Sequence, residues 1–230
     1  RIETKAFEQA CASLGLSPAR LVERCGALPS TPDYHLGRFL FERYPGGTGF
    51  PAVAPPAVPA GLPLAEVAAF SLDDASTTEI DDALSVTRRA GDLVRVGVHI
   101  AAPGLGFAPG SEIDRIARER LSSAYMPGAK ITMLPPAAVE RFSLIQDGPR
   151  AAVSLYLDVD PATLAVRGEE TRIELVPIAA NLRHHEVELL NDALADGRPA
   201  AGMPFAAELE LLHRLALVLD AFALIGAAQR

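Results

Sequence analysis

The segment Ser71-Leu-Asp-Asp-Ala-Ser-Thr-Thr-Glu-Ile-Asp-Asp82 places five carboxylates within ten residues: Asp73, Asp74, Glu79, Asp81 and Asp82. Apolar runs at 67–72 and 83–84 flank it, so we expect the acids to be anchored on a core rather than carried on a solvated tail. Like charges at this density are costly to hold in a fold unless cations lie among them. Hard oxygen ligands without a closed cage suit Mg²⁺ or Mn²⁺, with substrate phosphate completing the shell. The segment therefore predicts a metal-dependent phosphodiester site.

Two plainer interpretations of these acids compete with a metal site. An acidic run is more often a solvated surface than an active site, so the cluster taken alone does not distinguish the two. An EF-hand loop does not fit, because no acid falls at every second position and no glycine stands at the sharp turn. The sequence that follows the acids strengthens the prediction of an active site.

Further blocks follow the acids in a fixed order. They are Val96-Gly-Val-His-Ile-Ala-Ala102, Pro109-Gly-Ser-Glu-Ile-Asp-Arg-Ile-Ala-Arg118, Ser123-Ala-Tyr-Met-Pro-Gly128, Ile131-Thr-Met-Leu-Pro-Pro136, Phe142-Ser-Leu144 and Arg150-Ala-Ala-Val-Ser-Leu155. With the acidic loop, this series resembles the catalytic domain of the ribonuclease II family, also called RNB domains. The members of that family are processive exoribonucleases that degrade RNA from its 3′ end. The likeness runs over about half of the chain, from 70 to 186.

The resemblance implies roles for single residues. The four acidic positions of the family fall on Asp73, Glu79, Asp81 and Asp82, which are thereby expected to be catalytic. We assign Asp73 and Asp82 to the primary metal, and Asp81 to a catalytic metal or to the nucleophilic water. Glu79 is one methylene longer than the usual aspartate, and we expect it to be a second ligand or to orient one. An aspartate common in the family is Ala102 here, which we take as the loss of a supporting residue.

The chemistry is consistent with these roles. Two divalent ions about 4 Å apart activate a water, stabilise the leaving 3′ oxygen and neutralise the phosphate. We expect Mg²⁺ or Mn²⁺ as cofactor, single-stranded RNA as substrate and 5′-nucleoside monophosphates as products.

RNA-binding residues are expected after the acids. The base-stacking tyrosine of the family matches Tyr125, although a tyrosine before a turn is otherwise more often a half-buried packing residue. A predicted helix over 111–120 carries Arg115 and Arg118, which are either solvated or, with Lys130 and Arg150, line an RNA channel.

Composition is consistent with such a protein but does not point to RNA. The chain has 230 residues and a net charge of −8, so no global basic field attracts nucleic acid, and a nuclease needs only a local basic groove. Two cysteines, Cys11 and Cys25, form no zinc pattern and suggest buried thiols in a reducing compartment. No apolar stretch could span a bilayer and no signal peptide opens the chain, so we expect a cytoplasmic location.

The predicted fold class is α+β. A small N-terminal helical module over 1–50, similar to a helix-turn-helix or winged helix, precedes a Pro/Ala-rich linker over 51–64 and a catalytic part over 65–230. The catalytic part should hold a mixed, mainly antiparallel sheet with packing helices. Helices are expected over 3–14, 18–25, 33–43, 184–195 and 205–227, and strands over 67–72, 83–88, 93–100, 151–159 and 172–178. His184 and His185 are expected to lie at an exposed helix start rather than in a metal site.

Catalytic domains of the resembling family normally continue beyond the point matching Arg230. We therefore expect this chain to be part of a longer protein that also holds the rest of the catalytic domain and a nucleic-acid-binding barrel. Residues 205–230 are then expected to pack against partners outside this chain. Two alternatives stay open: a catalytically silent RNA-binding member of the same fold, and a DNA-binding regulator that uses the N-terminal helices.

Overall fold

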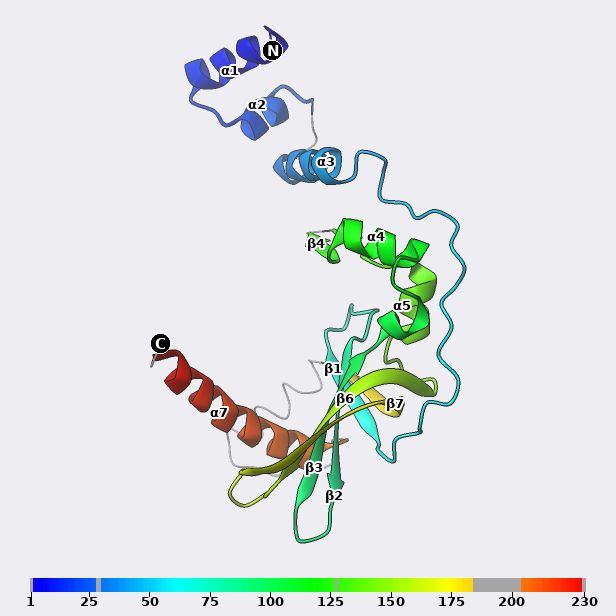
Figure 1. Ribbon diagram of the computed structural model, residues 1–230. Helices are drawn as coiled ribbons and strands as arrows, with labels where there is room; N and C mark the ends of the chain where they lie inside the picture. The colour runs from blue at the N-terminus through cyan, green and yellow to red at the C-terminus, as the bar shows by residue number, and fades with distance from the viewer. Residues whose placement is uncertain (1, 28–29, 127, 184–203, 229–230) are drawn as a thin grey trace. The chain divides into compact units, whose positions relative to one another are not determined.

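A computed structural model describes residues 2–27, 30–126, 128–183 and 204–228. They form two compact units, each treated on its own: Arg1–Ala54 with Arg115–Pro135, and Pro55–Asp114 with Pro136–Arg230. Figure 1 shows the order of the elements. The predicted helix over 184–195 and the histidine pair at its start lie outside the described residues.

The first unit begins with three helices, as predicted: α1 (Ile2–Leu14), α2 (Pro18–Arg24) and α3 (Thr31–Arg43). The Ser17 side chain caps α2 by accepting a hydrogen bond from the Arg20 amide, and Ser30 caps α3 in the same way. A proline occupies the first turn of both helices, where its missing N–H costs no hydrogen bond. These caps explain where the helices start: α2 begins at the predicted residue, and α3 begins two residues earlier than predicted because Ser30 caps it.

Residues 115–135 join the same unit and contain the end of α4 (Glu112–Arg120) and a hairpin that the sequence did not reveal, β4 (Ala124–Met126) with β5 (Ala129–Ile131). Arg120 ties this segment to the end of the N-terminal part. Its guanidinium donates to the carbonyls of Thr48, Gly49 and Thr132 at 2.8–2.9 Å and lies 3.8 Å from the Phe50 ring centre. The Arg120 side chain therefore has a structural role in the first unit.

The second unit is a closed five-stranded barrel in the order β1-β2-β3-β6-β7. The strands are β1 (Ala69–Asp73), β2 (Asp82–Arg88), β3 (Val94–Ala101), β6 (Pro149–Val159) and β7 (Val166–Arg183). All neighbours pair antiparallel except β1 and β7, whose parallel pairing closes the barrel. The predicted α+β class and the mainly antiparallel sheet are confirmed.

The barrel core contains both apolar and polar side chains. Small and aliphatic residues, among them Ala69, Ala83, Val176 and Leu144, form one cluster. His99, the cross-strand neighbour of Ala83, is fully buried between the hydroxyls of Ser85 (Nε2 to Oγ, 2.9 Å) and Ser154 (Nδ1 to Oγ, 2.8 Å). The Val96-to-Ala102 block thus supplies a hydrogen-bonded core histidine, and burial lowers the pKa of this histidine to about 4.

Gly97 belongs to the same arrangement. A Cβ at this position would lie 2.5 Å from the Ser85 hydroxyl and 2.7 Å from Nε2 of His99, so only glycine leaves room for the imidazole. Next to the histidine, the Tyr156 hydroxyl donates to the buried Glu174 carboxylate at 2.6 Å. The polar core is satisfied: among the described residues no buried side-chain nitrogen or oxygen lacks a partner.

Helix α7 (Ala206–Ala228) packs on the outer face of the barrel. The same unit also contains the short helices η1 (Pro103–Gly106) and α5 (Pro136–Phe142). Leu209 packs with Phe70 and Leu182, and Leu215 packs with Val96 and Val159. Packing of residues 205–230 against partners outside this chain stays a prediction, and the helix over 205–227 is confirmed. The N-terminal half of α7 packs against apolar side chains on the outside of the barrel, contributed by β1, β3, β6 and β7.

Candidate active site

The acidic loop connects β1 to β2 and is anchored to the core by Ile80. Ile80 is 2% exposed and packs in the barrel cluster with Ala83 and Leu144. Its amide donates to the Ser143 hydroxyl at 2.7 Å, and its carbonyl accepts from the Leu144 amide at 2.8 Å. The Phe142-to-Leu144 block therefore serves the acidic loop directly, and the prediction that a core holds the acids is confirmed.

Polar contacts fix the rest of the loop. The Thr77 amide donates to the Asp74 carbonyl at 3.0 Å to form a turn. Arg183, at the end of β7, donates through Nη1 to the carbonyls of Asp74 (2.9 Å) and Thr77 (3.3 Å). The Ala101 amide donates to the Asp81 carbonyl at 2.8 Å. The loop backbone is thus held by residues of two strands, β3 and β7.

Asp73 and Asp82 are brought together. Asp73 ends β1 and Asp82 begins β2, and the two strands run antiparallel, so both acids lie at the same rim of the barrel. Although Asp82 is exposed, partial desolvation by the surrounding protein raises the pKa of its carboxyl, and the negative charge of Asp73 raises this pKa further. A bound cation would offset the electrostatic repulsion between two carboxylates of this kind.

Glu79 is half-buried and Asp81 is exposed, and both have interactions within the described residues. Within the described parts of the chain, no group of three or more histidine, cysteine, aspartate or glutamate side chains is close enough to hold a metal ion. The structure thus pairs Asp73 with Asp82 and does not add a third acid. Because Mg²⁺ is commonly held by one or two carboxylates together with substrate phosphate and water, this donor set fits such an ion. The assignment of metal to Asp73, Asp81 and Asp82 stays a prediction.

The predicted RNA-binding residues fall in both units. Arg150 belongs to the second unit, where its guanidinium donates to the Glu140 and Arg141 carbonyls at 3.2 and 3.0 Å and pairs with Asp147. It therefore holds the C-terminal end of α5, a role that sequence reasoning missed. Contact between Arg150 and RNA stays a prediction.

Tyr125, Arg115, Arg118 and Lys130 belong to the first unit and are all exposed. Tyr125 and Lys130 are cross-strand partners in the β4–β5 hairpin, and the ammonium lies 5.2 Å from the ring centre. The tyrosine ring is 67% exposed, so it is not the half-buried packing residue of the plainer interpretation. An exposed ring beside a cation suits a nucleotide, because the base can stack on the ring and the ammonium can contact a phosphate.

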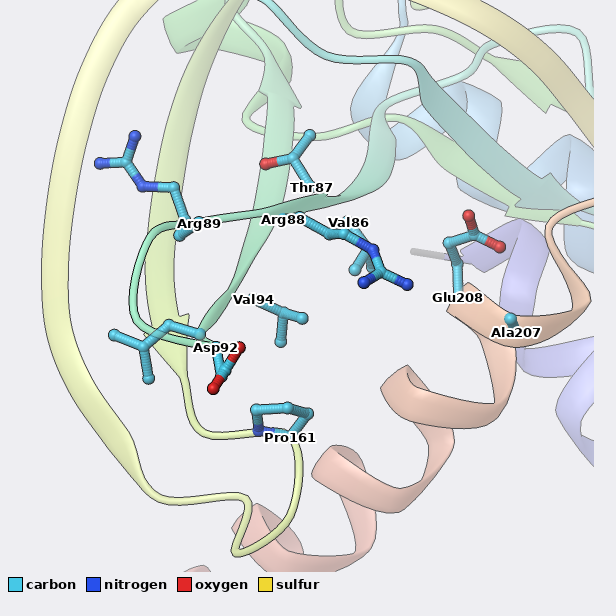
Figure 2. Close-up of a pocket in the computed structure, with 10 residues that line it drawn as sticks. Val86, Thr87, Arg88, Arg89, Asp92, Val94, Pro161, Ala207 and Glu208 are labelled. Carbon is cyan, nitrogen blue, oxygen red and sulfur yellow. The ribbon is translucent and has the colours of Figure 1, made fainter.

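A separate cavity of about 480 Å³ lies at the opposite end of β2, where Arg88, Arg89, Val94, Pro161 and Glu208 are among its walls (Figure 2). The length of β2, about 20 Å at 3.3 Å per residue, separates it from Asp82. The cavity is therefore distinct from the acidic loop.

The sequence of this chain matches one known protein family. The family model of the RNB domain matches residues 63–222. The chain belongs to the RNB domain family. A ribonuclease from Synechocystis sp. is 34% identical over 140 residues, which are 60% of this chain and 21% of that protein. Exoribonuclease 2 of Cronobacter sakazakii is 35% identical over 95 residues, which are 40% of this chain and 15% of that protein.

Solved structures share the fold. RNase R of Mycoplasma genitalium, in complex with ribose-methylated single-stranded RNA, has a TM-score of 0.58 at 18% identity, over 71% of this chain and 25% of that one. Yeast Ssd1, a pseudonuclease, has a TM-score of 0.57 at 22% identity, over 67% of this chain and 20% of that one. The chain thus spans at most about a quarter of the length of these relatives. Among the described residues, no helix is long and apolar enough to cross a membrane.

Proposed function

We propose that the protein containing this chain is a cytoplasmic 3′-to-5′ exoribonuclease that hydrolyses single-stranded RNA to 5′-nucleoside monophosphates with the help of Mg²⁺ or Mn²⁺. The observation that carries the proposal is the acidic loop: it has acids at all four positions that match the family, and two of them, Asp73 and Asp82, lie at the same rim of the barrel. Ile80 holds the loop to the core, so the acids are preorganised before substrate arrives. The remaining part of the catalytic domain and a nucleic-acid-binding barrel are expected elsewhere in the whole protein.

Each acid has a distinct role in this proposal. Asp73 and Asp82 would hold the divalent ion, and Asp81 would orient and deprotonate the attacking water. Glu79 would hold a second ligand in place. A divalent ion, when bound, lowers the pKa of its water and neutralises charge on the phosphate. Tyr125 would stack on a base near the 3′ end and thereby keep the scissile phosphate in register.

End-labelled RNA tests the proposal. The whole protein with Mg²⁺ should release labelled mononucleotide at once from 3′-labelled single strands, and shortening products that keep the label from 5′-labelled ones. Circular RNA of the same sequence has no 3′ end and should stay intact. Internal cuts, cleavage of the circle, or undiminished activity in excess EDTA would contradict the proposal.

A second candidate is a catalytically silent RNA-binding protein. Two Arabidopsis thaliana proteins, a DIS3-like exonuclease and an inactive exonuclease, are each 37% identical to this chain over 98 residues. Similarity alone therefore does not separate an active from a silent member. The same RNA assay does: a silent protein would bind 3′-tailed RNA and release no nucleotide at any Mg²⁺ or Mn²⁺ concentration.

A further inference from the structure

Ser71 connects Asp73 to Asn181, a residue 110 positions later in the sequence. It lies two residues before Asp73 on β1, so both side chains point to the same side of the strand. The Ser71 side chain is 1% exposed, and its hydroxyl donates to Oδ2 of Asp73 at 2.6 Å. A serine hydroxyl has one proton, so any further hydrogen bond to its oxygen must come from a donor.

Asn181 supplies that donor from β7, the parallel neighbour of β1, where it is in register with Ser71. Its Nδ2 donates to the Ser71 hydroxyl at 2.9 Å and to the Leu144 carbonyl at 3.0 Å. Its Oδ1 accepts from the Gln146 amide at 2.8 Å. A flipped amide would set oxygen against the Leu144 carbonyl and nitrogen against an N–H group, so the two backbone groups fix the orientation of the amide.

The direction of the whole chain of hydrogen bonds follows. Because the Asn181 amide can only donate to Ser71, the proton of Ser71 is forced towards Asp73. That bond occupies Oδ2 of Asp73, and among the described residues Oδ1 has no hydrogen-bond partner. The carboxylate is thus held by one oxygen while the other stays available, on the side of the strand that it shares with Ser71.

We propose that Ser71 and Asn181 are positioning residues that fix the orientation of the Asp73 carboxylate for binding a divalent ion. The inference rests on the proposed function, since it concerns the same acids. Ser71 and Asn181 touch neither substrate nor the ion, and they act only through Asp73. Outer partners of this kind typically change metal affinity by roughly 10–100-fold when removed.

Metal affinity of the whole protein without RNA is the direct readout. Titration with Mn²⁺, followed by electron paramagnetic resonance, should show the Kd rising about tenfold in Ser71→Ala and in Asn181→Ala. The double variant should be no weaker than Ser71→Ala alone, because both residues act through one hydroxyl. Ser71→Thr keeps the hydroxyl and should restore the wild-type Kd. In RNA hydrolysis, Ser71→Ala should need more Mg²⁺ for half-maximal rate and recover at saturating Mg²⁺.

Ser85→Ala is the matched control, because Ser85 is equally buried in the same barrel but its hydroxyl contacts His99. It should lower the melting temperature and leave the Mn²⁺ Kd unchanged. The inference is overturned if Ser71→Ala binds Mn²⁺ like the wild type, or if Ser85→Ala weakens binding as much. If Ser71→Ala loses Mn²⁺ affinity but no form hydrolyses RNA, the inference stands and the proposed exoribonuclease activity fails.

Discussion

Asp73 and Asp82 lie at the same rim of the barrel, and the charge of Asp73 adds to partial desolvation in raising the pKa of Asp82. The loop between them is pinned at Ile80, so the two carboxyls cannot move apart by a simple shift of the loop. The fold therefore keeps together two groups that repel each other when both are ionised. Such an arrangement is costly to stability and is useful where a cation is to be bound.

Removing one acid should separate catalysis from binding. Asp81→Asn keeps the shape of the side chain and removes its charge, so RNA hydrolysis by the whole protein should fall by orders of magnitude. RNA affinity, measured by filter binding in EDTA, should change little, because contacts to the RNA backbone dominate it. The neighbouring Asp74→Asn, outside the four family positions, is the control and should hydrolyse RNA at nearly the wild-type rate. Near wild-type cleavage by Asp81→Asn would show that Asp81 is not catalytic.

The exposed ring of Tyr125 should affect the end product. A base–aromatic contact contributes about 1–3 kcal/mol, so Tyr125→Ala should slow the last steps on short RNA and leave longer final fragments. Tyr125→Phe and Tyr125→Trp should keep the original end product, because the ring face stacks and the hydroxyl does not. Gel analysis of the final fragments provides the measurement. A lower melting temperature of Tyr125→Ala with an unchanged product pattern would instead identify a packing residue.

His99 should make the stability of the barrel depend on pH. Its pKa in the folded chain is about 4, below the ordinary 6.5, because burial disfavours the charged imidazole. The unfolded chain therefore binds more protons between these values, and the stability that the neutral histidine contributes is lost as pH falls through this window. The free energy of unfolding should drop by about 2 kcal/mol from pH 7 to pH 5 on account of His99.

Urea denaturation at both pH values measures this drop. His99→Gln, which does not titrate, is the comparison and should show a smaller dependence on pH than the wild type. An equal dependence in both proteins would mean that His99 does not contribute.

Two arginines on one helix should behave differently. Arg120 donates to three carbonyls and lies over Phe50, so Arg120→Ala should destabilise the first unit by about 2 kcal/mol. Arg118 is exposed on the same helix, so Arg118→Ala should change stability by less than about 0.5 kcal/mol. If Arg118 lines an RNA path, its loss should weaken RNA binding and reduce the salt dependence of affinity. Thermal unfolding and RNA binding at two salt concentrations test both statements.

Several features could be predicted from local sequence because local physics determines them. Ser-Pro and Ser-Thr-Pro signals at 17–18 and 30–32 start helices α2 and α3, and alternating apolar residues such as Val153, Leu155 and Leu157 indicate strand β6. The acidic loop is visible because its charge density is unusual in any context. Its link to the blocks that follow could be recognised only through the family resemblance.

Other features were not predictable in this way. The hairpin β4–β5 and helix α5 are short, and their patterns are too brief to separate from loops. The polar residues Ser71 and Asn181 stand 110 positions apart, and nothing in either local pattern indicates a partner. Likewise, the sequence does not distinguish Arg120 and Arg150 from solvated or RNA-contacting arginines. In the structure, each guanidinium donates hydrogen bonds to backbone carbonyls.

The sequence by itself determined which residues carry charge, where the helices and strands begin, and that four acids share one loop between two strands, since these depend on side-chain chemistry and local spacing. The tertiary structure decided which acids meet. Parallel pairing of β7 with β1 closes the barrel, brings Asn181 beside Ser71, and lets Arg183 hold the loop. Strand order and register set those contacts, and both depend on how the whole chain buries its apolar faces, which no single segment encodes.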